Sequence, residues 1–471
     1  MKKSGIVKNI AAVTFSNITT ILSGIVVSLL LPKILPVADY GWLKTFTLYT
    51  TYVGFFSLGI IDGIVLKHGG DDYNQLNRPL FRNYFRWYSI IHLSFFSFLI
   101  LISFFIRDNN YRFICVMLGI YLVIANYTGY FQQISQITQR FKEYSIRKII
   151  YSVVKIIVVL FLYFWSFIGF APTYKVYLAL FMASEVAISG WYFYTYLDLI
   201  KGASIPIKGT RRQIISLSLT GFPLLFANLC STLILSLDRQ FVSILFETEV
   251  YAKYAFAYNM LSLVTVAMSA ISTVLYPTLK RTTPETMKKN YGSLTGIISI
   301  FVFAAVAAYY PLCIFVEWFL PKYIESLPIF RIVFPGLALS SSITVVMHNY
   351  YKALGKNIIY FRKSIVVLLI SGTANWIAYQ LFHTTISISI ASILTMIFWY
   401  LYIDQFFVNT YGYSRTRNFS YVMIMLLGFY LCSCIPNYYL GFATYIVCLV
   451  AVTFTVHKKT VMEDLKVILQ K

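Results

Sequence analysis

Stretches of about 20 mainly apolar residues recur along almost the whole chain, and short polar segments separate them. This length suits an α-helix that crosses a membrane, whereas barrel strands are shorter and alternate in polarity. The pattern predicts an all-α integral membrane protein with about 14 transmembrane helices. The predicted spans are residues 6–31, 39–62, 84–106, 112–137, 146–170, 174–198, 212–237, 250–278, 292–316, 328–351, 360–382, 386–409, 419–436 and 440–456.

A weak internal repeat relates the two halves of this pattern. A shift of 211 residues aligns Phe15, Asn17, Leu22 and Tyr40 with Phe226, Asn228, Leu233 and Tyr251. Because six helices separate the copies, both keep the same orientation, which predicts two parallel six-helix bundles around a central cavity. The expected parts are an N-terminal bundle at 1–205, a C-terminal bundle at 206–410, and two extra helices with a cytoplasmic tail at 411–471.

Composition agrees with a membrane protein that has no soluble domain. Of the 471 residues, 59% are hydrophobic and 12% are charged, about half the charged share of a soluble domain. Every predicted loop is too short for a catalytic domain. The six cysteines lie in apolar segments without a histidine cluster, so we expect them to pack within helices rather than bind metal. No cofactor is expected.

Basic residues fall unevenly on the two sides of the predicted membrane. With alternating spans, 29 of the 39 Lys and Arg residues lie on the side of the N-terminus and 8 on the other, while Lys44 and Lys155 lie inside helices. Basic loops remain in the cytoplasm, so both termini are predicted to be cytoplasmic. This loop pattern accounts for the net charge of +22, and no nucleic-acid partner is expected.

Ionisable residues within the spans are candidate functional residues, because a charge in hydrocarbon is costly unless it is paired or solvated. Some lie deep within helices and others nearer helix ends: Lys44, Asp62, Arg147, Lys155, Glu185, Asp238, Arg239, Lys253 and Glu317. Prolines at 223 and 335 fall inside predicted helices, where they permit bending.

Lys155 and Glu185 are the deepest of these charges. Lys155 lies about two turns from the cytoplasmic end of the fifth span, and Glu185 lies near the middle of the sixth. They are expected to pair if they face each other. Structural alternatives stay open: a plain hydrogen bond for Glu185, snorkelling for Lys44, and an interfacial charge pair for Asp238 with Arg239.

Three segments resemble bacterial polysaccharide flippases of the Wzx type. They are Tyr40-Gly41 with Gly59-Ile-Ile-Asp-Gly-Ile-Val-Leu-Lys-His-Gly-Gly, Leu237-Asp238-Arg239 with Tyr251-Ala-Lys-Tyr-Ala-Phe-Ala-Tyr, and Tyr350-Tyr-Lys-Ala-Leu-Gly-Lys. The resemblance covers roughly residues 1–410, and 411–456 fits as two extra helices. It extends to the multidrug/oligosaccharidyl-lipid/polysaccharide exporter superfamily.

The resemblance implies a flippase that moves polyprenyl-diphosphate-linked oligosaccharides from the cytoplasmic to the outer leaflet by alternating access. The implied setting is O-antigen or capsule biosynthesis in the bacterial cytoplasmic (inner) membrane, with a polysaccharide polymerase or glycosyltransferases as partners besides the membrane lipids. A proton or sodium gradient would supply the energy. The expected substrate-binding residues are Lys44, Lys155, Lys253 and Arg239, and the expected ion-coupling or cavity carboxylates are Glu185, Asp238 and Asp62.

Two other classes of protein compete with this interpretation. One is a cation-coupled drug or small-molecule antiporter of the same superfamily. The other is a membrane-embedded polysaccharide polymerase or glycosyltransferase, for which a large outer loop with catalytic basic residues is typical. No such loop is predicted, and the sequence has no Walker A loop, H-E-x-x-H or G-x-S-x-G motif. A non-enzymatic transporter is therefore favoured.

Overall fold

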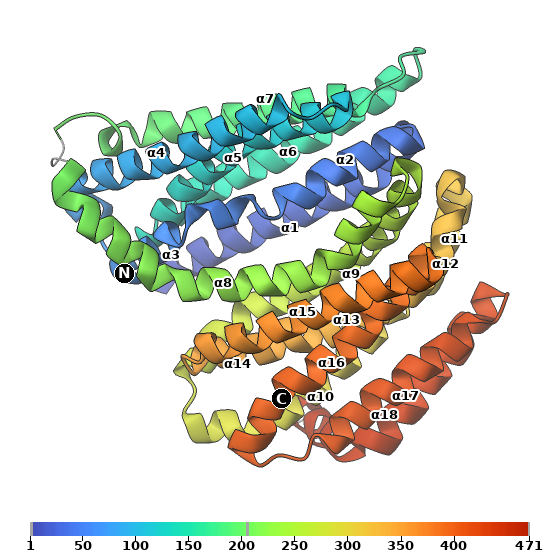
Figure 1. Cartoon of the computed structure of the whole chain (residues 1–471). Coiled ribbons are helices and arrows are strands. Elements are labelled where there is room, and N and C mark those ends of the chain that lie inside the picture. The colour runs from blue at the N-terminus through green and yellow to red at the C-terminus, as the bar shows by residue number, and fades with distance from the viewer. Residues whose placement is uncertain (1–2, 204–206, 470–471) are drawn as a thin grey trace. The chain divides into compact units, whose positions relative to one another are not determined.

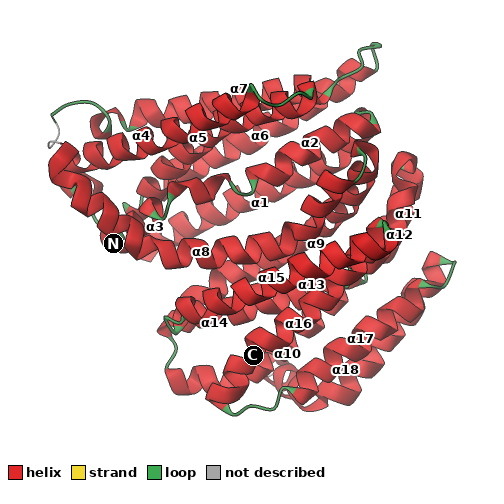
Figure 2. Ribbon diagram, in the orientation of Figure 1, coloured by secondary structure: helices red, strands yellow, loops and turns green. Residues whose placement is uncertain are grey.

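A computed structural model describes residues 3–203 and 207–469, and these ranges fold into helices joined by short loops without a β-strand (Figures 1 and 2). The chain forms two compact units, residues 1–229 and 230–471. The division falls inside one long helix, α8. The expected all-α class is confirmed, while the division at 205/206 and 410/411 stays a prediction.

The N-terminal unit contains seven α-helices, three 3₁₀ turns and the first part of α8. Their bounds are α1 Lys3–Ile34, α2 Val37–Thr50, η1 Val53–Ser57, α3 Ile60–His68, η2 Tyr73–Gln75, α4 Arg78–Ser103, α5 Asn109–Ile137, α6 Phe141–Ser166, α7 Tyr174–Thr195, η3 Leu197–Leu199 and α8 Ile207–Leu245.

The C-terminal unit contains the rest of α8 and ten further α-helices. Their bounds, with one 3₁₀ and one π segment, are α9 Thr248–Arg281, α10 Pro284–Val306, α11 Tyr309–Phe319, η4 Pro321–Ser326, α12 Leu327–Val333, α13 Gly336–Ser341, η5 Ser342–Met347, α14 His348–Ala353, α15 Asn357–Phe382, α16 Thr385–Tyr411, α17 Thr416–Ser433 and α18 Tyr438–Leu469.

Ten helices among the described residues are long and apolar enough to cross a membrane, or up to twelve when each of two bent pairs counts as one span. The protein is thus a multi-pass membrane protein. Each of the fourteen predicted segments overlaps an observed helix, but the count of 14 spans is not confirmed. The predicted spans 250–278 and 419–436 correspond to α9 and α17, which are outside the ten to twelve.

The second predicted span is broken rather than continuous. The chain leaves α2, makes the turn η1 and enters α3 with a bend of 54°. Leu58 and Gly59 have positive φ angles of 50° and 77° at this break. Two freed carbonyls are satisfied from other helices: Asn126 Nδ2 donates to Val53 O at 3.0 Å, and Ser218 Oγ donates to Leu58 O at 2.5 Å. Broken helices persist at membrane depth where neighbours supply such bonds.

Glycines allow α3 to touch α8 backbone to backbone. A Cβ atom at Gly59 would lie 2.7 Å from Phe222 N, and one at Gly63 or Gly221 would overlap the backbone of Leu217 or Gly59. Such a close approach is possible only without side chains. The glycines therefore fix the position of the broken span against α8.

The other bend follows Pro335. Helices α12 and α13 meet there at a bend of 52°, in agreement with the expected bending at this proline. Pro223, by contrast, lies within the uninterrupted helix α8.

Candidate functional site

A cavity of about 370 Å³ with a mixed polar and apolar lining lies in the N-terminal unit beside the broken span. Its polar lining includes Thr50, Ser57, Asp62, Asn126 and Gln133. These residues come from the segment α2–η1–α3 and from α5, so the broken span contributes several polar side chains to the cavity wall. Asp62, which was predicted to be an ion-coupling or cavity carboxylate, therefore lies on a cavity wall.

Lys155 and Glu185 lie together in the same unit. Lys155 is in the middle of α6, and Glu185 is in the middle of α7 and only 6% exposed. The hydroxyl of Tyr151 donates a hydrogen bond to the Glu185 carboxylate. The Lys155 ammonium lies 4.2 Å from the centroid of the Tyr151 ring and attracts Glu185 electrostatically. The structure thus brings these two predicted residues into one cluster.

Aromatic rings connect this cluster to the cavity. Phe181 lies one turn before Glu185 on α7, with its ring centroid 5.3 Å from the Lys155 ammonium. Tyr121 of α5 packs on Phe181 at 5.8 Å and also lines the cavity. Phe46 of α2 contacts both rings, at 5.9 and 6.4 Å. Aromatic faces and a tyrosine hydroxyl therefore surround Lys155 and Glu185.

Lys44 contacts an aromatic ring of its own helix. Its ammonium lies 5.1 Å from the centroid of the Tyr40 ring, one turn back on α2. Tyr40 is itself buried. Lys44 stays a predicted substrate-binding residue, and the snorkelling alternative also stays open.

Asp238 and Arg239 belong to a second polar network, in the C-terminal unit. Asp238 is 2% exposed and accepts hydrogen bonds from the hydroxyl groups of Tyr254, at 2.8 Å, and Tyr258. The Arg239 guanidinium lies 4.8 Å from the Tyr258 ring centroid. Ser389 of α16 donates to the Tyr254 hydroxyl at 3.4 Å. Asp238 is therefore a buried carboxylate that accepts hydrogen bonds from two tyrosine hydroxyl groups, and the alternative of an interfacial charge pair with Arg239 stays open.

Lys253 lies apart from both networks. Its ammonium forms a 2.6 Å ion pair with Glu325, whose side chain is 78% exposed. An exposed pair of this kind contributes little to stability. Only the carboxylate of this pair is well exposed, because the Lys253 side chain is itself 24% exposed, and Lys253 stays a predicted substrate-binding residue.

Sequence reasoning missed a third buried carboxylate. Asp404 of α16 is fully buried and accepts hydrogen bonds from Tyr291 at 2.6 Å and from Tyr413 at 2.7 Å. Its position inside the predicted span 386–409 was the available signal. These two bonds attach helix α10 and the loop after α16 to α16. The surroundings of Asp404 therefore indicate a structural role.

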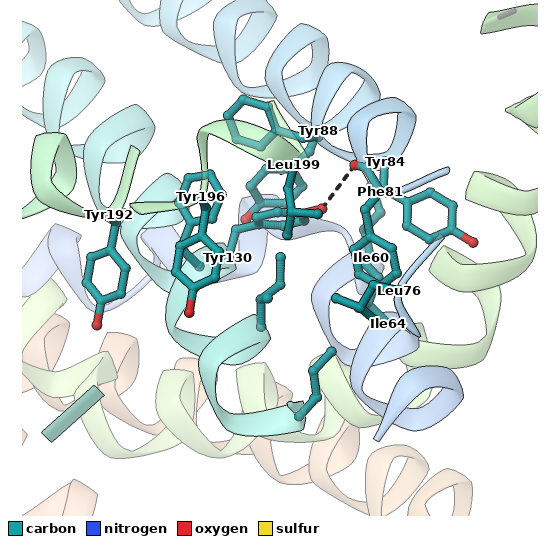
Figure 3. Close-up of a cluster of buried hydrophobic side chains, with 14 of the residues drawn as sticks. Ile60, Ile64, Leu76, Phe81, Tyr84, Tyr88, Tyr130, Tyr192, Tyr196 and Leu199 are labelled. Atoms are coloured by element: carbon teal, nitrogen blue, oxygen red, sulfur yellow. Dashed lines mark hydrogen bonds between the residues drawn. The ribbon is translucent and has the colours of Figure 1, made fainter. Parts of the chain in front are cut away.

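A cluster of buried, largely aromatic side chains lies within the N-terminal unit (Figure 3). It joins the broken span to α4, α5, α7 and α8, and its fully or almost fully buried rings include Tyr84, Tyr88, Tyr130, Tyr192 and Tyr196. Tyr130 donates to Phe81 O at 3.4 Å, the bond drawn in Figure 3. These contacts hold α3 and the cavity wall in position.

Two arginines border this cluster at the predicted cytoplasmic end. The Arg147 guanidinium lies 4.5 Å from the Tyr192 ring centroid, and the Arg140 guanidinium lies 4.3 Å from that of Tyr73. Tyr73 also donates to Asp198 at 2.8 Å. Burial and this carboxylate raise the pKa of the Tyr73 hydroxyl, so it remains a donor at neutral pH. Charged and aromatic groups therefore connect neighbouring segments at the predicted cytoplasmic end of the N-terminal unit.

Comparison with solved structures shows which membrane proteins share this fold. The lipid II flippase MurJ, in an inward closed conformation, matches with a TM-score of 0.70 and 11% sequence identity over 97% of this chain and 100% of that chain. An inward-facing multidrug resistance MATE family transporter of the MOP superfamily matches with a TM-score of 0.59 and 13% identity, over 85% and 96% of the two chains. A MOP superfamily transporter from Pyrococcus furiosus has a TM-score of 0.53 and 12% identity, over 86% and 96%. The fold is the one these membrane proteins share.

The family follows from the sequence match. A family model described as polysaccharide biosynthesis protein matches residues 6–283, more than half of the chain. No curated protein matches this chain in sequence. The chain belongs to the polysaccharide biosynthesis protein family, which confirms the resemblance drawn from its motifs.

Proposed function

We propose that this protein is a flippase that moves polyprenyl-diphosphate-linked oligosaccharide units from the cytoplasmic to the outer leaflet for surface polysaccharide biosynthesis. It would work by alternating access in the bacterial cytoplasmic membrane, with both termini in the cytoplasm. The family match and the fold shared with a lipid II flippase support this proposal. O-antigen and capsule units are the substrates we favour.

One observation carries the proposal: a lysine and a glutamate share a polar, aromatic site in the middle of the N-terminal unit. Lys155 and Glu185 lie mid-helix, where an isolated charge is costly, and Tyr151 bonds the carboxylate. A lysine ammonium binds phosphate as a point charge. Aromatic rings such as Tyr121 and Phe181 can pack on sugar faces. The site therefore offers groups for both parts of a diphosphate-linked sugar.

Carboxylates in both units are the candidates for coupling to a proton or sodium ion. Glu185 would change its attraction for Lys155 on protonation, and Asp238 would change its bonds to Tyr254 and Tyr258. Asp62, on the cavity wall, is the third candidate. Polysaccharide polymerase or glycosyltransferases would be the partners that use or supply the substrate.

A second candidate function is a cation-coupled drug antiporter. The buried network around Asp238, with its hydroxyl donors, favours an ion-linked transport cycle, and the fold is also that of MATE family transporters. The apolar aromatic surroundings of Lys155 would equally suit an organic anion.

The deciding experiment measures outward movement of a labelled polyprenyl-diphosphate oligosaccharide in liposomes that contain the purified protein. The oligosaccharide lipid is taken from the organism that makes the protein. An impermeant glycosidase or oxidant reports the outer leaflet, and proton and sodium gradients are imposed in turn. We expect protein-dependent outward movement, slowed about tenfold or more by Glu185→Gln, since a charge-assisted hydrogen bond contributes about 1.5–3 kcal/mol.

The matched control is Lys175→Gln, which removes an exposed charge from the same helix as Glu185. Movement equal to that of empty vesicles under both gradients would sink the flippase proposal and favour the antiporter. Movement that is normal in Glu185→Gln would remove Glu185 from the site.

A further inference from the structure

Helix α6 contains the same five-residue motif twice. Tyr144-Ser-Ile-Arg-Lys148 and Tyr151-Ser-Val-Val-Lys155 both read Tyr-Ser-x-x-Lys, with an offset of seven residues. Seven residues make almost two helical turns, so the two motifs face nearly the same way, about 10.5 Å apart along the helix. The second copy contributes Lys155 and Tyr151 to the site described above, and the first lies closer to the predicted cytoplasmic end.

The two copies make the same contact within the helix. The Lys148 ammonium lies 5.6 Å from the centroid of the Tyr144 ring, and the Lys155 ammonium lies 4.2 Å from that of Tyr151. In each copy the lysine is therefore held over the ring one turn before it, as cation–π attraction favours. Both lysines are half-buried, and α6 packs along α1 in the N-terminal unit.

The copies differ in what neutralises the lysine. Lys155 is attracted by the Glu185 carboxylate. The hydrogen bonds described for Lys148 go to neutral groups, Asn17 Oδ1 of α1 at 2.7 Å and the Tyr144 hydroxyl at 3.4 Å. Neutral acceptors do not offset the positive charge of Lys148, so an anion would be attracted more strongly to the first copy of the motif than to the second.

Polar groups continue between the two lysines. Ser152 of α6 and Thr20 of α1 lie within hydrogen-bond distance, 3.1 Å apart. The neighbouring cation, Arg147, points elsewhere, since it bonds Thr195 of α7 at 2.6 Å and lies over the Tyr192 ring. Lys148, Ser152 and Lys155 thus form one polar stripe on α6, partly shared with α1.

We propose that Lys148 and Lys155 are two successive binding positions for the phosphate-bearing part of the lipid-linked substrate. This inference rests on the proposed function. A diphosphate is shorter than the separation of the two motifs, so it would occupy Lys148 first and then move to Lys155. The Lys148 position would reduce the cost of bringing an anion into the membrane. It would replace part of the lost hydration before the anion reaches the middle of the membrane.

The test is binding of a short-chain isoprenyl diphosphate to the full-length protein in nanodiscs, followed by flipping of the labelled oligosaccharide lipid in liposomes. The variants are Lys148→Gln and Lys148→Arg, and Lys142→Gln is the matched control because it removes an exposed charge near the same end of α6. We expect Lys148→Gln to weaken binding and slow flipping about tenfold, with Lys148→Arg within about threefold of wild type. The salt dependence of binding should also fall in Lys148→Gln alone.

Tyr144→Leu is the second variant, for the case that Lys148→Gln does not fold. It keeps the lysine but removes the ring beneath it, and we expect weaker binding than in the control. Wild-type binding and flipping in both Lys148→Gln and Tyr144→Leu would overturn the two-position inference while leaving the flippase proposal intact. Lys148-dependent diphosphate binding without any flipping would support the anion site and count against the flippase. Absence of binding by the wild-type protein would overturn the inference directly.

Discussion

Lys155 and Glu185 show how two ionisable side chains are accommodated in the middle of predicted spans. Each was a candidate from its position in an apolar segment, but their sharing of one site depends on the packing of α6 against α7. The carboxylate is stabilised by the Tyr151 hydroxyl and the ammonium by the Tyr151 ring. Removing one charge leaves the other buried and uncompensated, whereas removing both does not.

This argument predicts strong coupling between the two residues. Lys155→Met should lower the free energy of unfolding by about 1–3 kcal/mol, because it leaves Glu185 without its cation. Glu185→Gln in the same chain should recover at least half of that loss. The measurement is thermal unfolding of detergent-purified protein in a double-mutant cycle.

Lys175→Met, at an exposed position of α7, is the control and should leave the unfolding temperature unchanged. Additive effects of Lys155→Met and Glu185→Gln would show that the two side chains do not interact.

The broken span α2–η1–α3 positions the cavity through helix packing rather than through side-chain chemistry alone. Gly59 and Gly63 let the backbone of α3 touch α8, and Ser218 caps the carbonyl freed at Leu58. The sequence contained these glycines, but membrane helices are rich in glycine generally. Their role became evident only from the backbone of α8 that lies against them.

Gly63→Ala should therefore be destabilising. A methyl group at this position overlaps the backbone of Leu217, which cannot move aside as a flexible side chain can. We expect a loss of about 1–3 kcal/mol in unfolding free energy from overpacking, measured as a lower thermal unfolding temperature. The same change should slow transport, since it displaces the cavity wall.

Gly190→Ala provides the comparison, because nothing lies within 4 Å of a Cβ at that position of α7. It should be neutral or slightly stabilising, as expected for glycine replacement within a helix. Equal unfolding temperatures for the two variants would argue against a tight contact between α3 and α8.

The distribution of basic loops predicts on which side of the membrane each loop and both termini of the chain lie. Cys434, in the turn between α17 and α18, is exposed and lies on the predicted outer side. Labelling of Cys434 by a reagent that cannot cross the membrane would report the orientation of α17 and α18. Because spans alternate in direction, it would also report the side on which the C-terminus lies.

We expect an impermeant maleimide to label Cys434 in intact spheroplasts, in a variant in which the other five cysteines are replaced by alanine or serine. A cysteine introduced at Ser414, between α16 and α17, should react only after permeabilisation. The reverse pattern would invert the predicted topology and place both termini outside.

The local order of residues was enough to predict the helices, the membrane class and most of the charged candidates. Apolar segments of spanning length have few alternatives in lipid, because the backbone must satisfy its own hydrogen bonds. The family resemblance also lay in local motifs, such as Leu237-Asp238-Arg239, and the family match confirmed it.

Tertiary packing decided which of those ionisable residues lie side by side and where helices break. It placed Glu185 beside Tyr151 and Lys155, paired Lys253 with the exposed carboxylate of Glu325, and buried Asp404 among hydroxyl groups. A hydropathy pattern records how far along a helix a residue lies, but not which neighbour it faces. Pairing of charges depends on that direction, and only the packed helices fix it.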